Sequence, residues 1–147
     1  MISLEVLRRY PYFAKVSEES LKKVAMAADE FIVPAGATLF TEGDPADKLY
    51  ILLDGELDIQ YTLGSGEKKT VDTLVSGELM LWSALVEPFR STESGKLRKD
   101  SRLVAIDGKK LRELCEQDHS LGFRMMNSVA QLLATRLEGA RVQLATV

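Results

Sequence analysis

The sequence is poor in the residue types that most often build metal and catalytic centres. Its 147 residues include one cysteine, Cys115, and one histidine, His119. A lone cysteine cannot close a disulfide within the chain, so we expect a reducing, cytoplasmic environment. No second cysteine or histidine is available to complete a metal site with the usual nitrogen and sulfur ligands. We therefore expect a protein that is not an enzyme and holds no metal.

The sequence also lacks an excess of positive charge and a long apolar run. Its 19 basic and 22 acidic residues give a net charge of −3, so we expect no direct binding to nucleic acid or to an anionic membrane. No run approaches the ~18 apolar residues of a membrane span, and the amino terminus has no apolar core of a signal peptide. At this length, residues 1–147 are expected to form one domain.

Glycines recur in the sequence where short apolar runs have to reverse direction. Gly43-Asp44 and Gly55-Glu56 bracket one such run, in which Leu49, Ile51 and Leu53 alternate with the period of a half-buried strand. Residues 29–107 therefore predict a roll of short strands that holds a ligand pocket. The strands are expected at residues 31–33, 38–41, 48–53, 56–63, 68–74, 91–97 and 101–106.

Helical periods flank the roll on both sides. Residues 1–28 predict two short helices, at 2–9 and 17–28, and residues 108–147 predict a short helix at 108–117 followed by a long one. Apolar residues along the long helix recur in alternating steps of three and four, which is typical of a helix that pairs with another helix. This seam comprises Phe123, Met126, Ala130, Leu133, Leu137, Ala140, Leu144 and Val147.

We expect the first half of this seam to pack on the roll and the second half to meet a twin helix. The result would be a parallel homodimer formed through residues 123–147. Ala140, next to Gly139, would let the two backbones approach closely.

The order of these elements and four short motifs resemble the cyclic-nucleotide-binding domain, in the form of the effector domain of catabolite activator proteins. The motifs are Glu42-Gly43-Asp44, Tyr50-Ile51, Asp54-Gly55 and Gly77-Glu78-Leu79. The resemblance covers nearly the whole chain. It implies a mainly β fold with helices: a jelly roll, or double-stranded β-helix, with amino-terminal helices and a long carboxy-terminal dimerisation helix. It also implies cyclic AMP or cyclic GMP as the ligand.

The resemblance further implies that a phosphate-binding segment follows Gly77. Glu78 would accept a hydrogen bond from the ribose hydroxyl, and a helix over residues 79–84 would present backbone N–H groups to the phosphate. Arg90 and Ser91 match the Arg-Ser pair of the family, and a guanidinium suits two phosphate oxygens. The ligand-binding residues implied are Gly77, Glu78, Leu79, Arg90, Ser91 and Thr92.

Three features of this segment depart from the family pattern. Counted back from residues 104–106, the arginine position falls on Ser91, so Arg90 is one residue early and would point to the opposite face of a strand. Glu93 would place a carboxylate beside the phosphate and repel it. Trp82 would either fill the pocket or stack on a base.

The function expected is a regulatory sensor that binds a cyclic nucleotide or a similar small anionic effector and transmits the change through the helix dimer. On the long helix, Gln131, Thr135 and Arg136 are candidate donors to the base. One alternative is the effector part of a transcription regulator without its DNA-binding head, which would begin near Val147. The other is an interaction domain with a filled pocket and no ligand.

Overall fold

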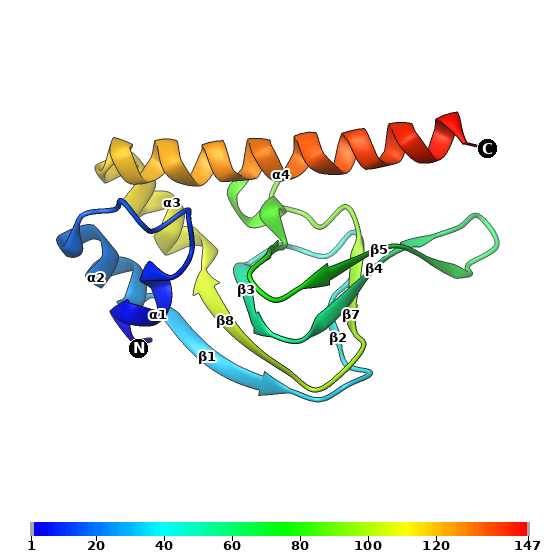
Figure 1. Cartoon of the computed structure of the whole chain (residues 1–147), viewed down its shortest axis with the longest axis horizontal. Helices are drawn as coiled ribbons and strands as arrows, with labels where there is room; N and C mark the ends of the chain where they lie inside the picture. Colours follow the sequence, from blue (N-terminus) through cyan, green and yellow to red (C-terminus); the bar gives the residue numbers. More distant parts are fainter. Residues whose placement is uncertain (1, 147) are drawn as a thin grey trace.

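The fold is mainly β with helices at both ends of the chain, as expected from the sequence (Figure 1). It is seen in a computed structural model that describes residues 2–146. The helices are α1 (Leu4–Arg8), α2 (Glu18–Met26), the one-turn 3-10 helix η1 (Trp82–Leu85), α3 (Gly108–Gln117) and α4 (His119–Ala145). The strands are β1 (Ala28–Val33), β2 (Thr38–Phe40), β3 (Lys48–Asp54), β4 (Glu56–Thr62), β5 (Lys68–Val75), β6 (Leu79–Met80), β7 (Ser94–Leu97) and β8 (Ser101–Asp107).

These strands form two antiparallel sheets that make up the jelly roll. One sheet has the order β1-β8-β3-β6 and the other the order β2-β7-β4-β5. The alternation seen in the sequence places Leu49 and Ile51 of β3 in the core, together with Leu57 and Ile59 of β4. The alternation fails at the end of β3, where the register with β8 shifts between Leu52 and Asp54. Leu52, the neighbour of Ile51, is also fully buried.

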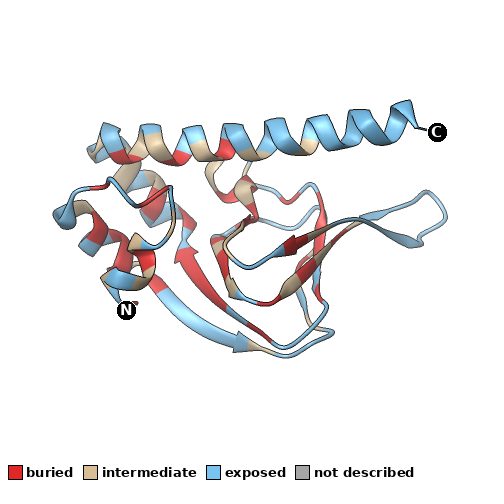
Figure 2. Ribbon diagram, viewed as in Figure 1, coloured by how far each residue is buried: buried red, intermediate tan, exposed pale blue. Residues whose placement is uncertain are grey.

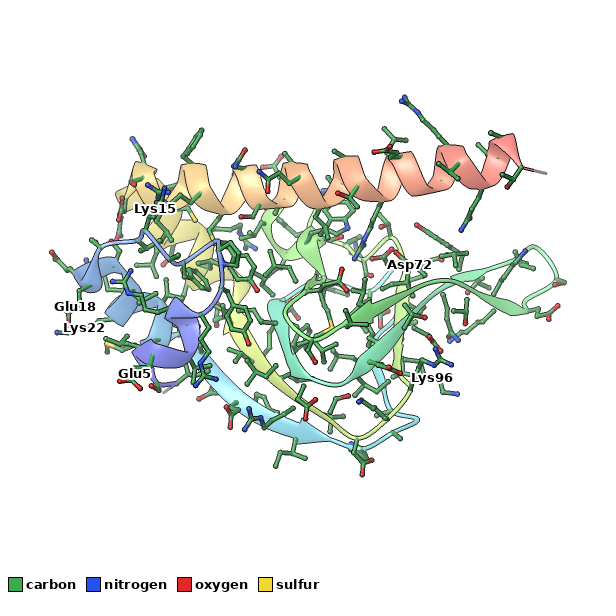
Figure 3. All side chains as sticks on the ribbon, viewed as in Figure 1. Glu5, Lys15, Glu18, Lys22, Asp72 and Lys96 are labelled. Atoms are coloured by element: carbon green, nitrogen blue, oxygen red, sulfur yellow. The ribbon has the colours of Figure 1, made fainter. Side chains whose placement is uncertain are left out.

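The short helices begin and end close to their predicted limits. Ser17 caps α2, as expected, by accepting a hydrogen bond from the Ser20 N–H at 3.2 Å. That helix ends at Met26 rather than at residue 28. Ala28 instead pairs with Ile106 at the start of β1. The charged side chains of the amino-terminal helices, including Glu18 and Lys22, lie on the outer surface (Figure 3).

The long helix α4 lies along the roll, and its carboxyl end extends in the same direction as the β4–β5 hairpin (Figure 1). Asp118 caps it by accepting hydrogen bonds from the Ser120 N–H at 3.0 Å and the Leu121 N–H at 3.3 Å. Its buried face is formed by Leu121, Met125 and Val129. These residues recur every four positions and so lie on one side of the helix.

The predicted packing of the first half of the seam is therefore wrong. Phe123 is 72% exposed and Met126 is 40% exposed, because the residues that face the roll are on another side of the helix. The exposed apolar side chains that the seam predicted form a line along nearly the full length of α4. We call this line the apolar stripe: Phe123, Met126, Leu133, Leu137 and Leu144. Figure 2 shows how exposed the second half of α4 is. Val147, the last residue of the predicted seam, lies outside the described residues.

Candidate functional site

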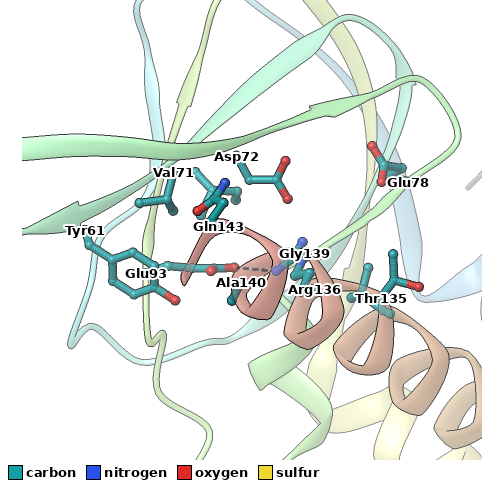
Figure 4. A pocket seen from close by; sticks show the side chains of 12 residues that line it. Tyr61, Val71, Asp72, Glu78, Glu93, Thr135, Arg136, Gly139, Ala140 and Gln143 are labelled. Carbon is teal, nitrogen blue, oxygen red and sulfur yellow. Dashed lines mark hydrogen bonds and ion pairs between the residues drawn. The ribbon is translucent and has the colours of Figure 1, made fainter. Parts of the chain in front are cut away.

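A cavity of about 480 Å³ lies between the β4–β5 hairpin and α4 (Figure 4). We call it the α4 cavity, because six residues of that helix line one wall. Apolar side chains of β4 and β5 form much of the opposite wall, and polar groups project between the two walls. The lining residues are Ile59, Tyr61, Val71, Asp72, Glu78, Glu93, Leu132, Thr135, Arg136, Gly139, Ala140 and Gln143.

A buried ion pair crosses the α4 cavity. Nη1 of Arg136 lies 2.8 Å from Oε1 of Glu93 and donates a hydrogen bond to it. The Glu93 side chain is 7% exposed and that of Arg136 is 18% exposed, so water screens the pair weakly. The pair joins α4 to the segment that leads into β7 (Figure 4). It therefore fixes where the helix sits against the roll.

The guanidinium of Arg136 is only partly satisfied by this pair. Its Nε and Nη2 atoms are buried, and no described residue accepts a hydrogen bond from them. Tyr61 lies nearby, and the pKa of its phenol is raised, first by burial and then by the Glu93 carboxylate. The phenol is therefore protonated at neutral pH.

Glu78 reaches the α4 cavity from the turn that precedes β6. Gly77 makes this turn with a φ of +96°, a left-handed conformation that favours glycine. The turn is held from two sides: the Tyr12 hydroxyl donates to the Gly77 carbonyl at 3.1 Å, and the Val75 N–H donates to Glu78 Oε2 at 2.6 Å. Glu78 is thus positioned with a carboxylate that can accept a hydrogen bond from a ligand hydroxyl.

The helix predicted over residues 79–84 is wrong. Leu79 and Met80 instead pair with Ile51 and Tyr50 of β3, because both side chains are apolar and the core takes them. Leu81 adopts a left-handed conformation with a φ of 61°, and η1 follows. A 3-10 helix of four residues, beginning at Trp82, replaces the expected α-helix start. Trp82 is half-buried and does not line the α4 cavity.

Arg90 lies outside the α4 cavity. It is exposed, and its Nη1 donates to the Gly43 carbonyl at 3.0 Å. The next residue, Ser91, is buried, and its hydroxyl donates to the Glu93 carbonyl. Thr92 is exposed again. The structure thus brings Glu78 and Glu93 to one cavity and leaves Arg90 and Thr92 at the surface, where a role in binding stays a prediction.

Part of this lining was predicted from the sequence. Thr135 and Arg136 do line the α4 cavity, whereas the third candidate on the helix, Gln131, is exposed and does not. Asp72 and Gln143 were missed. Asp72 lies on the side of β5 that faces α4 (Figure 3). Asp72 and Gln143 line the cavity because α4 packs beside the β4–β5 hairpin. No sequence motif predicts this packing.

Other kinds of site find no support among the described residues. No group of three or more histidine, cysteine, aspartate or glutamate side chains is arranged to hold a metal ion within residues 2–146. In the same part of the chain, no helix combines the length and the apolar character needed to cross a bilayer.

Comparisons with known proteins agree on one kind of domain. A sequence profile described as Cyclic nucleotide-binding domain matches residues 30–118, more than half of the chain. A crystal structure from Geobacter metallireducens GS-15, named as a candidate cyclic nucleotide-binding protein, is 37% identical and has a TM-score of 0.83. The alignment covers 93% of this chain and 99% of that one.

Two further relatives are longer than this chain. The CRP-like cAMP-activated global transcriptional regulator of Mycobacterium tuberculosis is 22% identical over 129 residues, which are 88% of this chain and 58% of the regulator. The crystal structure of the Thermus thermophilus catabolite activator protein shares the fold, with a TM-score of 0.72 and 24% identity. That alignment covers 92% of this chain and 62% of the activator. The chain therefore spans less than two thirds of these relatives.

Proposed function

We propose that this chain, which belongs to the cyclic nucleotide-binding domain family, is a regulatory sensor for a cyclic nucleotide or a similar small anionic effector. One observation carries this proposal: a cavity of about 480 Å³ has α4 as one of its walls. Any ligand held there contacts the roll and the helix together. A regulatory domain needs such a connection between its ligand and an element that can move.

The helix α4 would pass the signal to a second copy of the chain. Its apolar stripe is exposed in the single chain, with Phe123 72% and Leu144 76% exposed. Apolar side chains in heptad-like steps stabilise paired helices by packing into one another. A ligand that favours one position of α4 would shift the geometry of such a homodimer by its difference in affinity for the two positions.

The test of the ligand is a titration of the purified chain with cyclic AMP and with cyclic GMP. Glu78→Ala is expected to weaken binding roughly ten- to a hundredfold, because one hydrogen bond to a charged acceptor is lost. Glu67→Ala is the matched control, because it removes an exposed carboxylate at the hairpin tip, away from the α4 cavity. Isothermal titration calorimetry measures both. Unchanged affinity of Glu78→Ala would remove Glu78 from the site.

A second candidate function is a ligand-free interaction domain. The observation that favours it is the ion pair of Glu93 and Arg136, which already places opposite charges across the α4 cavity. This function predicts a dimer whose melting temperature does not change with either nucleotide at millimolar concentration. A shift with either nucleotide would exclude it.

A role within a longer transcription regulator is a third proposal, supported by the mycobacterial relative, of which the chain spans 58%. In that case the chain is the effector and dimerisation part of the regulator. The length of the gene product tests this directly, because a DNA-binding domain would have to follow residue 147.

A further inference from the structure

The positive charge of the α4 cavity is on α4 itself. Among the described residues that line the cavity, Arg136 is the cation, whereas Asp72, Glu78 and Glu93 are acidic. The arginine that the sequence favoured, Arg90, is exposed and bonded to the Gly43 carbonyl. An anion inside the cavity therefore finds its opposite charge on the helix.

The guanidinium of Arg136 has one edge that is still free. Nη1 is bonded to Glu93, whereas Nε and Nη2 are buried without an acceptor among the described residues. Nε and Nη2 form the side edge of a guanidinium, whose two parallel N–H groups match two oxygens of a phosphate or carboxylate. Buried donors without partners are unfavourable. A ligand that brings two oxygens to this edge would satisfy both.

Glu93 has two opposing effects on such a ligand. Its carboxylate, which is 7% exposed, accepts the bond from Nη1 and so holds the guanidinium in place. Its negative charge would also lie close to an anion at the free edge and repel it, and this repulsion is strong where water is scarce. A neutral side chain of the same shape would keep the first effect and remove the second.

We infer, on the basis of the proposed function, that the Nε and Nη2 edge of Arg136 receives the anionic group of the effector, and that Glu93 positions this arginine and limits the affinity. Asp72 and Glu78 in the same cavity then accept hydrogen bonds from donor groups, such as hydroxyls, elsewhere on the ligand. Because both nitrogen atoms are covered, a ligand reaches them only when the Arg136 side chain moves relative to the roll, and this side chain is carried by α4. The arginine that binds the ligand therefore also links occupancy to the position of the helix.

The experiment is calorimetric titration of the intact chain with cyclic AMP, cyclic GMP and uncharged adenosine. Arg136→Lys keeps the charge that pairs with Glu93 but loses the forked edge, so nucleotide affinity should fall roughly tenfold. Glu93→Gln keeps an acceptor for Nη1 and removes the repulsion, so nucleotide affinity should rise at least about tenfold. The affinity for adenosine, which has no phosphate, should be the same in both variants as in the wild type. Arg102→Gln, which removes an exposed arginine of β8 that does not line the α4 cavity, is the control and should bind as the wild type does. Arg90→Gln tests the rival arginine.

The outcomes separate this inference from the proposed function. Wild-type affinity in Arg136→Lys, or lost binding in Arg90→Gln, would overturn the inference and leave a nucleotide sensor in place. Binding by Glu93→Gln but not by the wild type would support Arg136 as the anion receptor and reject the nucleotide as the effector of the natural chain. Binding by neither would overturn both. Thermal melts of each variant verify that it is folded.

Discussion

Cys115 is packed in a way that suppresses its chemistry. Burial, and next the negative charge of Asp118, raise the pKa of its thiol to about 11. The thiolate is the reactive form, so the folded chain should react with iodoacetamide at pH 8 roughly a hundredfold more slowly than an ordinary thiol. The same chain unfolded in urea is the control. Equal rates for the two would show that packing does not suppress the reactivity of this thiol.

At the scale of residues, the sequence predicts which residues belong to the site better than it predicts where their side chains point. Glu93 was expected close to the anion, and it does line the α4 cavity. Its partner was not foreseen, because 43 residues separate Glu93 from Arg136. Only the packing of α4 on the roll brings the two together. For Arg90, an offset of one residue decides between the cavity and solvent, and such an offset depends on the local path of the chain.

At the scale of elements, Asp118 joins two helices. It caps α4, and its carboxylate also accepts a hydrogen bond from the Ser20 hydroxyl of α2. Asp118→Ala should lower the free energy of unfolding by about 1 kcal/mol at pH 7, as expected for a lost cap. Urea unfolding followed by circular dichroism measures this. A variant as stable as the wild type would show that the cap does not contribute.

The contribution of Asp118 should depend on pH. The Ser20 hydroxyl, and next the Leu121 N–H, lower the pKa of this carboxyl in the folded chain. The stabilisation is therefore fully present above the ordinary aspartate pKa of about 4 and is lost as the pH falls through the lower folded value. Asp118→Asn keeps a good cap without a titrating charge. The difference in the free energy of unfolding between this variant and the wild type should shrink as the pH falls from 5 to 2. Urea unfolding at each pH measures this difference.

Elements with a clear repeat of apolar residues were predicted well. Elements whose structure depends on pairing with a strand distant in the sequence were not. The helix at residues 108–117 lies where its pattern placed it. The segment after Gly77 was predicted as a helix, but β3 takes Leu79 and Met80 into its sheet. A pairing partner far away in the sequence overrides a weak local preference.

At the scale of the whole molecule, the apolar stripe predicts how two chains assemble. Leu137 is 54% exposed in the single chain, so Leu137→Lys should leave the fold intact. In the proposed dimer it would place a charge in the helix seam and weaken association at least about tenfold. Sedimentation velocity over a range of concentrations measures this.

Gln131→Lys is the matched control for this variant. It adds the same side chain at an exposed position of α4, about 120° around the helix from Leu137. It should dimerise as the wild type does. A dimer that persists in Leu137→Lys would place the interface on another surface of the molecule.

The hydrogen bond from Tyr12 to the Gly77 carbonyl joins the amino-terminal segment directly to the turn that carries Glu78. The donor and acceptor are 65 residues apart, and the acceptor belongs to the residue immediately before Glu78. A partner protein that binds the amino-terminal helices would thus change the position of the Glu78 carboxylate without touching the helix that carries Arg136. The affinity for one effector would then depend on two separate elements, the amino-terminal segment through Glu78 and α4 through Arg136.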